Sequence, residues 1–214
     1  MMGVPFGKLI CASNRNNVLT DFIRTGKYDR NRQFYNTTSP SMDILISSNL
    51  ERMLYALTGD ASEVKSYMDQ LNADGTYEVR SEVKDSLQNL FSGYCCDDVQ
   101  TKAYIAKVYA ENGYLIDPHT AVGFSALDQY RAETGDNTPC VVVSTASPFK
   151  FCDSVLSALG ESDIAAGLDV LDQLSEKSGL PAPAPLAGLR NKQVRFTTTV
   201  EKENMVDAVM TMLE

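Results

Sequence analysis

Two short segments of the chain, near residues 9–12 and 140–144, are apolar almost throughout and do not alternate with polar positions. Turn-forming residues such as Asn14 and Pro139 flank them. Continuous apolar runs of this kind are typical of strands that are buried on both faces of a parallel sheet. We therefore predict a buried parallel strand at each place, and a further strand at residues 194–200.

Most of the remaining chain shows the periodicity of helices. Leu50, Met53, Leu54 and Leu57, for example, have the i, i+3, i+4, i+7 spacing of a single apolar helix face. Capping residues precede such segments and glycines often follow them, which sets their bounds. The predicted helices run from 16 or 17 to 26, 49 to 57, 60 or 62 to 71, 81 to 91, 97 to 113, 117 to 130, from 147 onwards, and from 203 to 213.

Helices that alternate with apolar strands predict an α/β fold, with a parallel sheet flanked by helices. In such sheets ligands bind beyond the carboxyl ends of the strands. The two places to examine are therefore residues 13–17 and 144–148. The first predicted strand has only the apolar lead-in 1–6 before it. We therefore expect that a part of the fold upstream of this strand is missing from the chain.

Composition narrows the class of protein. The chain has 214 residues, 43% of them hydrophobic, which is enough for a sizeable core. Its formal net charge of -9 argues against a nucleic-acid partner. No apolar stretch is long enough for a membrane helix. Five cysteines, an odd number, indicate a reducing cytoplasm, and their spacing does not favour a metal site.

The residues that could carry chemistry are few, and the sequence alone leaves their roles open. Thr145 and Ser147 either cap the helix that follows or present hydroxyl groups to a ligand. His119 is the only histidine, so no Ser/His/Asp triad can be inferred around it. The small polar residues in 47–52 either cap a helix or face a ligand.

Several segments, in the same order along the chain, together resemble the threonine synthase family. The resemblance covers nearly the whole chain. The segments that carry it are residues 7–22 (GKLICASNRNNVLTDF), 38–44 (TSPSMDI), 47–52 (SSNLER), 117–123 (DPHTAVG) and 144–151 (STASPFKF).

The resemblance implies a pyridoxal-phosphate enzyme of fold type II, the tryptophan-synthase-β-like fold. It implies conversion of O-phospho-L-homoserine and water to L-threonine and phosphate. In that fold the ring nitrogen of the cofactor typically meets a hydroxyl residue, which by motif is Thr145 here. A neutral partner leaves the pyridine largely unprotonated, and therefore a weaker electron sink. Asp117 and His119 match a segment that lines the cofactor side of the site.

The chain departs from the family pattern in one respect. The family's Schiff-base lysine and its glycine-rich phosphate loop both lie upstream of the first matching segment, so this chain carries no catalytic lysine. Lys150 lies in a different context, near the other end of the fold. We therefore expect residues 1–214 to be the C-terminal part of the catalytic domain, with a helical insert at 59–96, and the isolated chain to be inactive.

Two other functions remain open. The chain could be a non-catalytic or complementing subunit of a split enzyme, whose partner is the missing N-terminal half. It could also be another fold-type-II enzyme such as a threonine dehydratase, although residues 39–52 weigh against this. An exposed edge of the parallel sheet would favour self-association.

Overall fold

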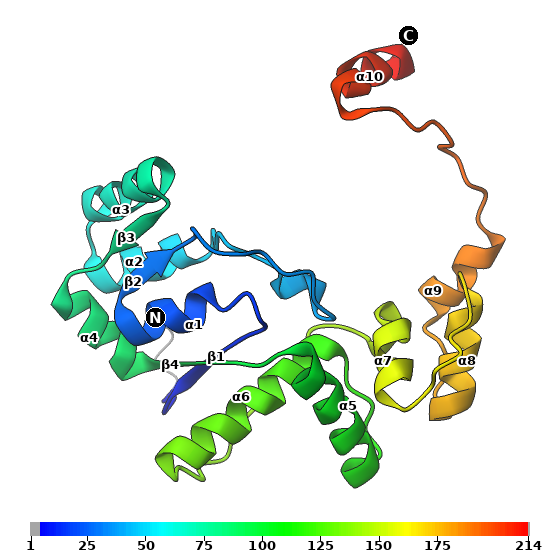
Figure 1. The fold of residues 1–214 in the computed structure, drawn as a ribbon, viewed down its shortest axis with the longest axis horizontal. Coiled ribbons are helices and arrows are strands. Elements are labelled where there is room, and N and C mark those ends of the chain that lie inside the picture. Colours follow the sequence, from blue (N-terminus) through cyan, green and yellow to red (C-terminus); the bar gives the residue numbers. More distant parts are fainter. Residues whose placement is uncertain (1–4, 214) are drawn as a thin grey trace.

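The computed structural model describes residues 5–213, which pack mainly around two hydrophobic cores. The first core lies among four helices and a short antiparallel pair of strands (Figure 1). At its centre the rings of Phe22, Tyr28, Tyr67 and Tyr77 stack or meet edge to face. Its elements are α1 (Val18–Thr25), β2 (Lys27–Asp29), α2 (Leu50–Thr58), α3 (Ala61–Asp74), β3 (Thr76–Glu78) and α4 (Ser81–Leu90).

A parallel pair of strands connects the first core to the following helices. β1 (Leu9–Ser13) pairs with β4 (Phe91–Cys95) residue for residue, so their carboxyl ends coincide. The pair lies between α1 and α6 (Pro118–Thr134), as Figure 1 shows. Because successive strand residues face opposite sides, Gly93 contacts α1 while Tyr94 packs against α6. The predicted α/β class with a parallel sheet is confirmed.

The burial predicted for residues 9–12 is wrong within the described part of the chain. Leu9 is 40% exposed, and the three residues after it are only partly buried. Within residues 5–213, β1 has a single neighbouring strand, β4, so its other edge and part of its faces meet solvent. The first four residues of the apolar lead-in lie outside the described residues.

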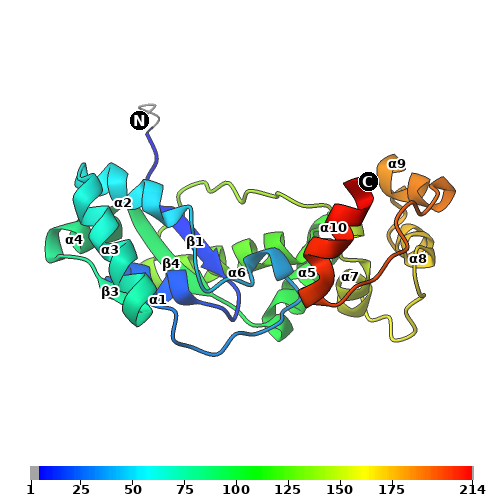
Figure 2. The same cartoon turned by 90° about the horizontal axis from the view of Figure 1, so that it is seen from above.

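The second core is built mainly by helices, with Leu115 and Ile116 contributed by the segment just before α6. α5 (Asp98–Asn112) packs along α6, and α7 (Cys152–Ala158) and α8 (Asp169–Ser178) follow beside it (Figures 1 and 2). The side chains in this core that have no exposed surface are those of Ile105, Ile116, Ala121, Val155, Leu156 and Leu174.

The helix bounds follow the sequence closely. Asp60, Asp97 and Asp117 each cap a helix start by accepting a hydrogen bond from a backbone N–H two or three residues on. Gly59 and Gly113 end helices in the left-handed backbone conformation that glycine adopts without strain. The predicted helix bounds are therefore mostly confirmed, because short-range contacts set them.

The strand predicted near residues 140–144 does not form. The segment instead runs along α6, where a Cβ atom added at Gly123 would lie 3.0 Å from Val142 Cγ1. Its alternate residues Val141 and Val143 are 89% and 72% exposed. A strand needs backbone partners, and no strand among the described residues runs beside this one. The apolar pattern is therefore present without a sheet to join.

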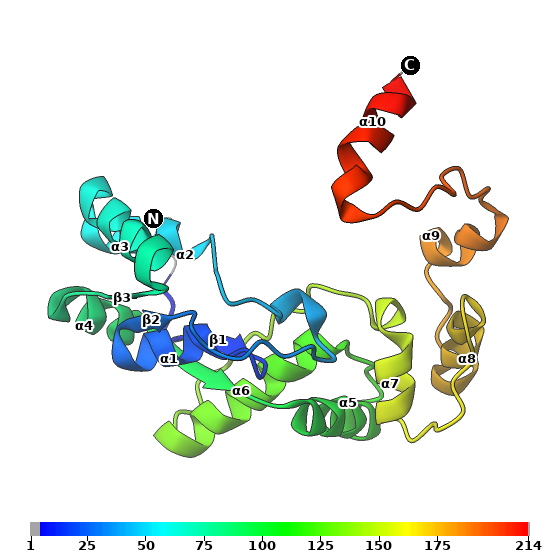
Figure 3. The ribbon, with the colours of Figure 1, turned by 45° about the horizontal axis from the view of Figure 1, so that its top comes forward.

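The chain ends in an extended arm, residues 192–213. The strand predicted at 194–200 is absent from it, for the same reason. After α9 (Ala184–Ala187) the arm leads to α10 (Met205–Leu213), which lies apart from the other helices in Figures 1 and 3. None of the helices within residues 5–213 is long and apolar enough to cross a membrane. The exposed apolar side chains of the arm are those of Val194, Phe196, Val200, Met205, Val206, Val209, Met210, Met212 and Leu213.

Residues 59–96, expected as a helical insert, build part of the shared first core. They contain α3 and α4, and also β3 and β4. β3 pairs with β2, and α3 and α4 contribute Val64, Leu71, Val83 and Leu87 to the core that α1 and α2 complete.

The close approach of α1 to the sheet at Gly93 gives a first prediction. A Cβ at this position would lie 3.0 Å from Thr20 Cα. We expect Gly93→Ala to lower the free energy of unfolding by about 1–3 kcal/mol, because α1 must move away. Gly188→Ala, which meets nothing within 4 Å, is the matched control and should change it by less than about 0.5 kcal/mol. Urea unfolding measures both, and equal effects would contradict the packing argument.

Candidate functional site

A single loop, residues 37–43, lies at the carboxyl ends of β1 and β4, where parallel sheets bind ligands. It contains a short 3-10 helix, η1 (Pro40–Met42). In Figure 3 the segment that carries η1 reaches from the first core towards α7. Hydrogen bonds from the end of β1, the start of α5 and the start of α6 hold this 37–43 loop in place.

The end of β1 holds the loop through the carboxylate of Asp43. Asn14 Nδ2 and Asn16 Nδ2 donate to Asp43 Oδ1 at 2.7 and 3.0 Å. Thr37 donates to the same carboxylate from its hydroxyl at 2.7 Å and from its backbone N–H at 3.0 Å. Asn14 and Asn16 are only 1% and 3% exposed. The predicted site at residues 13–17 is therefore occupied by contacts within the chain.

The start of α5 holds the loop through Asp98. Its Oδ1 accepts hydrogen bonds from the backbone N–H and the hydroxyl of Thr38, at 3.1 and 3.0 Å. β4 ends at Cys95, three residues before Asp98. The loop is therefore tied to both strands of the parallel pair, directly after each strand ends.

The start of α6 holds the loop through a histidine and a buried carboxylate. Asp117 is fully buried, and its Oδ1 accepts from His119 N at 2.9 Å and lies 2.8 Å from His119 Nδ1. The Thr120 hydroxyl donates to the other oxygen of Asp117. On the far side of the ring, His119 Nε2 accepts a hydrogen bond from Ser41 N at 3.1 Å.

The Asp117 carboxyl is ionised because its hydrogen bonds outweigh its burial. Burial raises the pKa of the Asp117 carboxyl, but hydrogen bonds from the His119 and Thr120 side chains and from the His119 backbone N–H lower it more. The net result is a pKa below the ordinary value of 3.8. The carboxylate is thus a fixed negative charge at the amino end of α6, where the helix dipole favours it.

The same network reaches the segment that was predicted to meet a cofactor. Thr120 Oγ1 lies 3.1 Å from Ser144 Oγ. The next residue, Thr145, is exposed, and its hydroxyl makes no hydrogen bond to any of residues 5–213. Further on, Ser147 accepts from Phe149 N at 3.3 Å and so caps the short helix η2 (Pro148–Lys150). Ser147 is therefore a cap, whereas Thr145 is free to face a ligand.

Thr145, Asp117 and His119, the predicted site residues, thus lie in one network but differ in accessibility. Asp117 and His119 are 0% and 7% exposed, and their polar atoms already have partners. Their contact with a cofactor stays a prediction. Sequence reasoning missed the roles of Asp43 and Ser41. The only signal for them was the pair of asparagines directly after a strand, which indicates a polar junction there.

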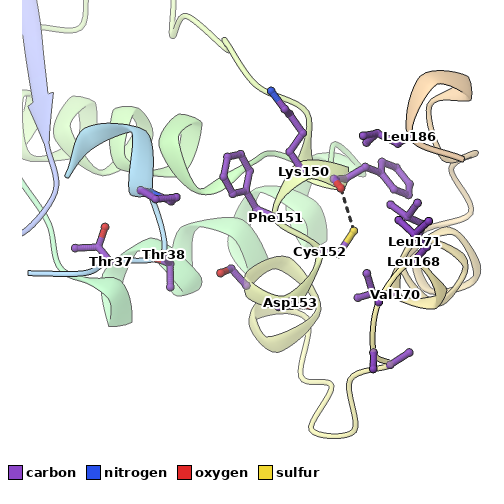
Figure 4. A pocket seen from close by; sticks show the side chains of 16 residues that line it. Thr37, Thr38, Lys150, Phe151, Cys152, Asp153, Leu168, Val170, Leu171 and Leu186 are labelled. Atoms are coloured by element: carbon purple, nitrogen blue, oxygen red, sulfur yellow. Dashed lines mark hydrogen bonds between the residues drawn. The ribbon is translucent and has the colours of Figure 1, made fainter. Parts of the chain in front are cut away.

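The 37–43 loop also forms one wall of an open cavity of about 720 Å³. The opposite wall comes from residues 149–154 and from the start of α8, as Figure 4 shows. Lys150 is exposed, and its ammonium group points away from Leu168 and Leu171 (Figure 4). The lining combines apolar side chains with the polar residues Thr37, Thr38, Lys150, Asp153 and Ser154. A small amphipathic molecule would match this chemistry.

Comparison with known proteins places these features in a family. A family model described as "Threonine synthase, C-terminal" matches residues 120–211. Threonine synthase-like 1 of Macaca fascicularis is 40% identical over 166 residues, which are 77% of this chain and 22% of that protein. Threonine synthase of Pseudomonas aeruginosa is 38% identical over 158 residues, which are 73% of this chain and 33% of that enzyme.

A solved structure extends the match to almost every residue. The crystal structure of threonine synthase from Brucella melitensis with bound pyridoxal phosphate matches 99% of this chain and 41% of its own, with a TM-score of 0.78 and 32% sequence identity. The chain therefore spans between about a fifth and two fifths of the length of these relatives. Its open arrangement, arm included, resembles that of the corresponding part of a larger protein.

The residues present fit one side of pyridoxal phosphate. A neutral hydroxyl with no partner among residues 5–213, that of Thr145, suits the nitrogen of an unprotonated pyridine ring. Ser144, tied to Thr120, fixes the backbone beside it. Lys150, the lysine of the cavity lining, is exposed and not enclosed, so it does not match the covalent attachment of the cofactor. The fit therefore covers the ring side alone.

The buried carboxylate gives a prediction for stability and its pH dependence. Because the pKa of Asp117 is lower in the folded chain than its ordinary value of 3.8, ionised Asp117 stabilises the fold fully above that pH. The contribution is lost as the pH falls through the folded-state pKa. We expect Asp117→Asn to lower the free energy of unfolding at pH 7 by roughly 2–4 kcal/mol.

Chemical denaturation between pH 3 and pH 8 measures this difference, which should narrow below pH 3.8. Asp69→Asn removes a surface ion pair with Lys65 and serves as the control, with a change below about 1 kcal/mol. If the difference in the free energy of unfolding between Asp117→Asn and the unsubstituted chain grew towards low pH, the lowered pKa of Asp117 would be contradicted.

Proposed function

The chain belongs to the threonine synthase family, and we propose that it forms part of an enzyme that converts O-phospho-L-homoserine and water to L-threonine and phosphate. The observation that carries the proposal is the free hydroxyl of Thr145, held next to a buried network at the start of α6. The match of 99% of the chain to a threonine synthase with bound pyridoxal phosphate supports it.

In this proposal pyridoxal phosphate, when bound, supplies the electron sink for proton removal next to the substrate's amino group. Thr145 would donate a hydrogen bond from its hydroxyl group to the ring nitrogen. This bond would orient the ring and leave the nitrogen unprotonated. Ser144 and Thr120 fix the backbone that presents this hydroxyl. Asp117 and His119 contribute to the cofactor side of the site indirectly, because Asp117 contacts both His119 and Thr120.

The 37–43 loop contributes the neighbouring wall. Its hydroxyl side chains, on Thr37 and Thr38, line the cavity opposite residues 149–154. Because Asp43 and Asp98 fix both ends of the loop, the wall is preorganised and loses little conformational entropy on binding. We propose that the substrate enters along this cavity.

All five cysteines are free, which supports a place in the reducing cytoplasm.

Taken by itself, we propose, the 214-residue chain is inactive, because it provides one wall of the site and lacks the Schiff-base lysine. The chain spans 33% of the Pseudomonas aeruginosa enzyme and 41% of the Brucella melitensis chain. The remaining part of such an enzyme would supply the lysine and the phosphate-binding loop.

A second candidate function is that of a complementing subunit, which pairs with a separate polypeptide to complete the site. The exposed apolar surfaces favour it: Val141 and Val143 project from a segment with no sheet to join, and the C-terminal arm exposes a row of apolar side chains. Burial of such surfaces drives association. The free edge of β1 offers a further place for a strand to pair.

The role of Thr145 is tested in the enzyme assembled with the lysine-bearing N-terminal part of a threonine synthase. We expect Thr145→Val to lower kcat at least about tenfold, since it removes one hydrogen bond to the ring. Thr145→Ser, which keeps the hydroxyl, should retain most of the activity. Threonine release from O-phospho-L-homoserine is the assay. Equal activity of all three proteins would exclude contact between Thr145 and the ring.

Size exclusion and absorbance test both candidates together. Alone, the chain should form no threonine and show no visible band after addition of pyridoxal phosphate. With a co-expressed N-terminal part the chain should elute as a heterodimer, form threonine and show the visible band. Threonine formation by the chain alone would refute the claim of inactivity. A monomer that ignores the N-terminal part would refute both candidates.

A further inference from the structure

His119 lies between the two walls of the cavity and contacts both of them. On one side its Nε2 accepts the hydrogen bond from Ser41 N in the 37–43 loop. On the other side its ring packs against Phe151, with centroids 4.7 Å apart and a tilt of 59°. Phe151 belongs to the opposite wall of the cavity. One buried imidazole thus contacts both walls.

The hydrogen-bond pattern fixes the tautomer of this imidazole. A backbone N–H can only donate, so His119 Nε2, which faces Ser41 N, must carry a lone pair. The Asp117 carboxylate can only accept, so Nδ1, 2.8 Å away, must carry the hydrogen. The carboxylate therefore orients the ring and makes Nε2 the better acceptor, as carboxylates do for metal-bound histidines.

Within the loop, the turn at Ser41 is the part that His119 holds, whereas Ser39 is held by Asn14, which donates to its carbonyl and hydroxyl oxygens at 3.2 and 3.1 Å. At the start of the loop Thr37 and Thr38 donate to Asp43 and Asp98. At its end Asp43 is held by Asn14 and Asn16. Ser41 is exposed, and its backbone N–H has His119 as its acceptor. Loss of that acceptor would release the Ser41 amide, while the ends of the loop and Ser39 would stay in place.

We propose that His119 is a positioning residue: its neutral imidazole, protonated on Nδ1 and oriented by Asp117, fixes the Ser41 turn of the 37–43 loop relative to the segment that carries Thr145. The second half of this coupling runs through Thr120, which contacts Asp117 and Ser144. The consequence for the cofactor site rests on the proposed function, whereas the placement of the loop does not. This role of His119 requires no contact with substrate or cofactor.

The tautomer is tested directly on the unsubstituted chain. Because His119 is the only histidine, labelling histidine with ¹⁵N gives a long-range ¹H–¹⁵N spectrum with a single imidazole. We expect a hydrogen-bearing Nδ1 and an unprotonated Nε2 at neutral pH. The opposite tautomer, or rapid exchange between the two tautomers, would overturn the proposal. The measurement needs no cofactor, so failure of the proposed function would leave its outcome unchanged.

Two substitutions then separate the two ends of the ring. His119→Gln places an amide oxygen near the position of Nε2, so it can still accept from Ser41. His119→Asn is shorter and keeps only the end that faces Asp117. We expect exchange of the Ser41 amide with solvent to be about tenfold faster in His119→Asn, the factor that corresponds to ~1.4 kcal/mol. In His119→Gln it should stay within about threefold of the unsubstituted rate.

The amide of Leu71, in the first core, is the internal reference and should exchange at the same rate in all three proteins. Faster exchange at both Ser41 and Leu71 would indicate a general loss of stability and would overturn the positioning role, as would equal Ser41 exchange in all three proteins. If His119→Asn does not fold, the tautomer of the unsubstituted chain and the His119→Gln rate decide the question.

Discussion

The structure around the candidate site depends on one constraint: a carboxylate buried away from water must be given hydrogen-bond donors. Asp117 has no exposed surface, and its donors come from the first turn of its own helix. Those donors, His119 and Thr120, each reach a second segment, Ser41 and Ser144 respectively. Because an unpaired buried charge would cost several kcal/mol, this arrangement fixes three distant segments relative to one another.

The same principle is repeated at the strand ends with different residues. Asp43 and Asp98 accept hydrogen bonds from Thr37 and Thr38 in the 37–43 loop, as His119 does from Ser41. Parallel strands bring the residues after them to one edge of the sheet. The loop can therefore span the carboxyl ends of β1 and β4 and still satisfy its backbone groups. The cavity beside it is thus built on contacts that are complete within the chain.

Other surfaces are not complete within residues 5–213. Val141 and Val143 face solvent, and the C-terminal arm packs on none of the cores. The chain nevertheless matches a threonine synthase structure over 99% of its length, at 41% coverage of that structure. The helices and the site wall are fixed by contacts within the chain, whereas these apolar surfaces are not covered by other described residues.

The sequence by itself determined the local elements. Helix starts at Asp60, Asp97 and Asp117 follow from capping hydrogen bonds that reach only two or three residues. The resemblance to a family also marked Thr145 and the start of α6 as expected parts of a cofactor site. The missed strands β3 and β4 are short and carry no continuous apolar run, so their pattern resembles that of the neighbouring helices and turns. Only the tertiary structure decided which apolar runs become strands and which polar side chains meet. Both depend on partners far away in the chain, such as Ser41 for His119, 78 residues apart, and sequence spacing does not encode such contacts.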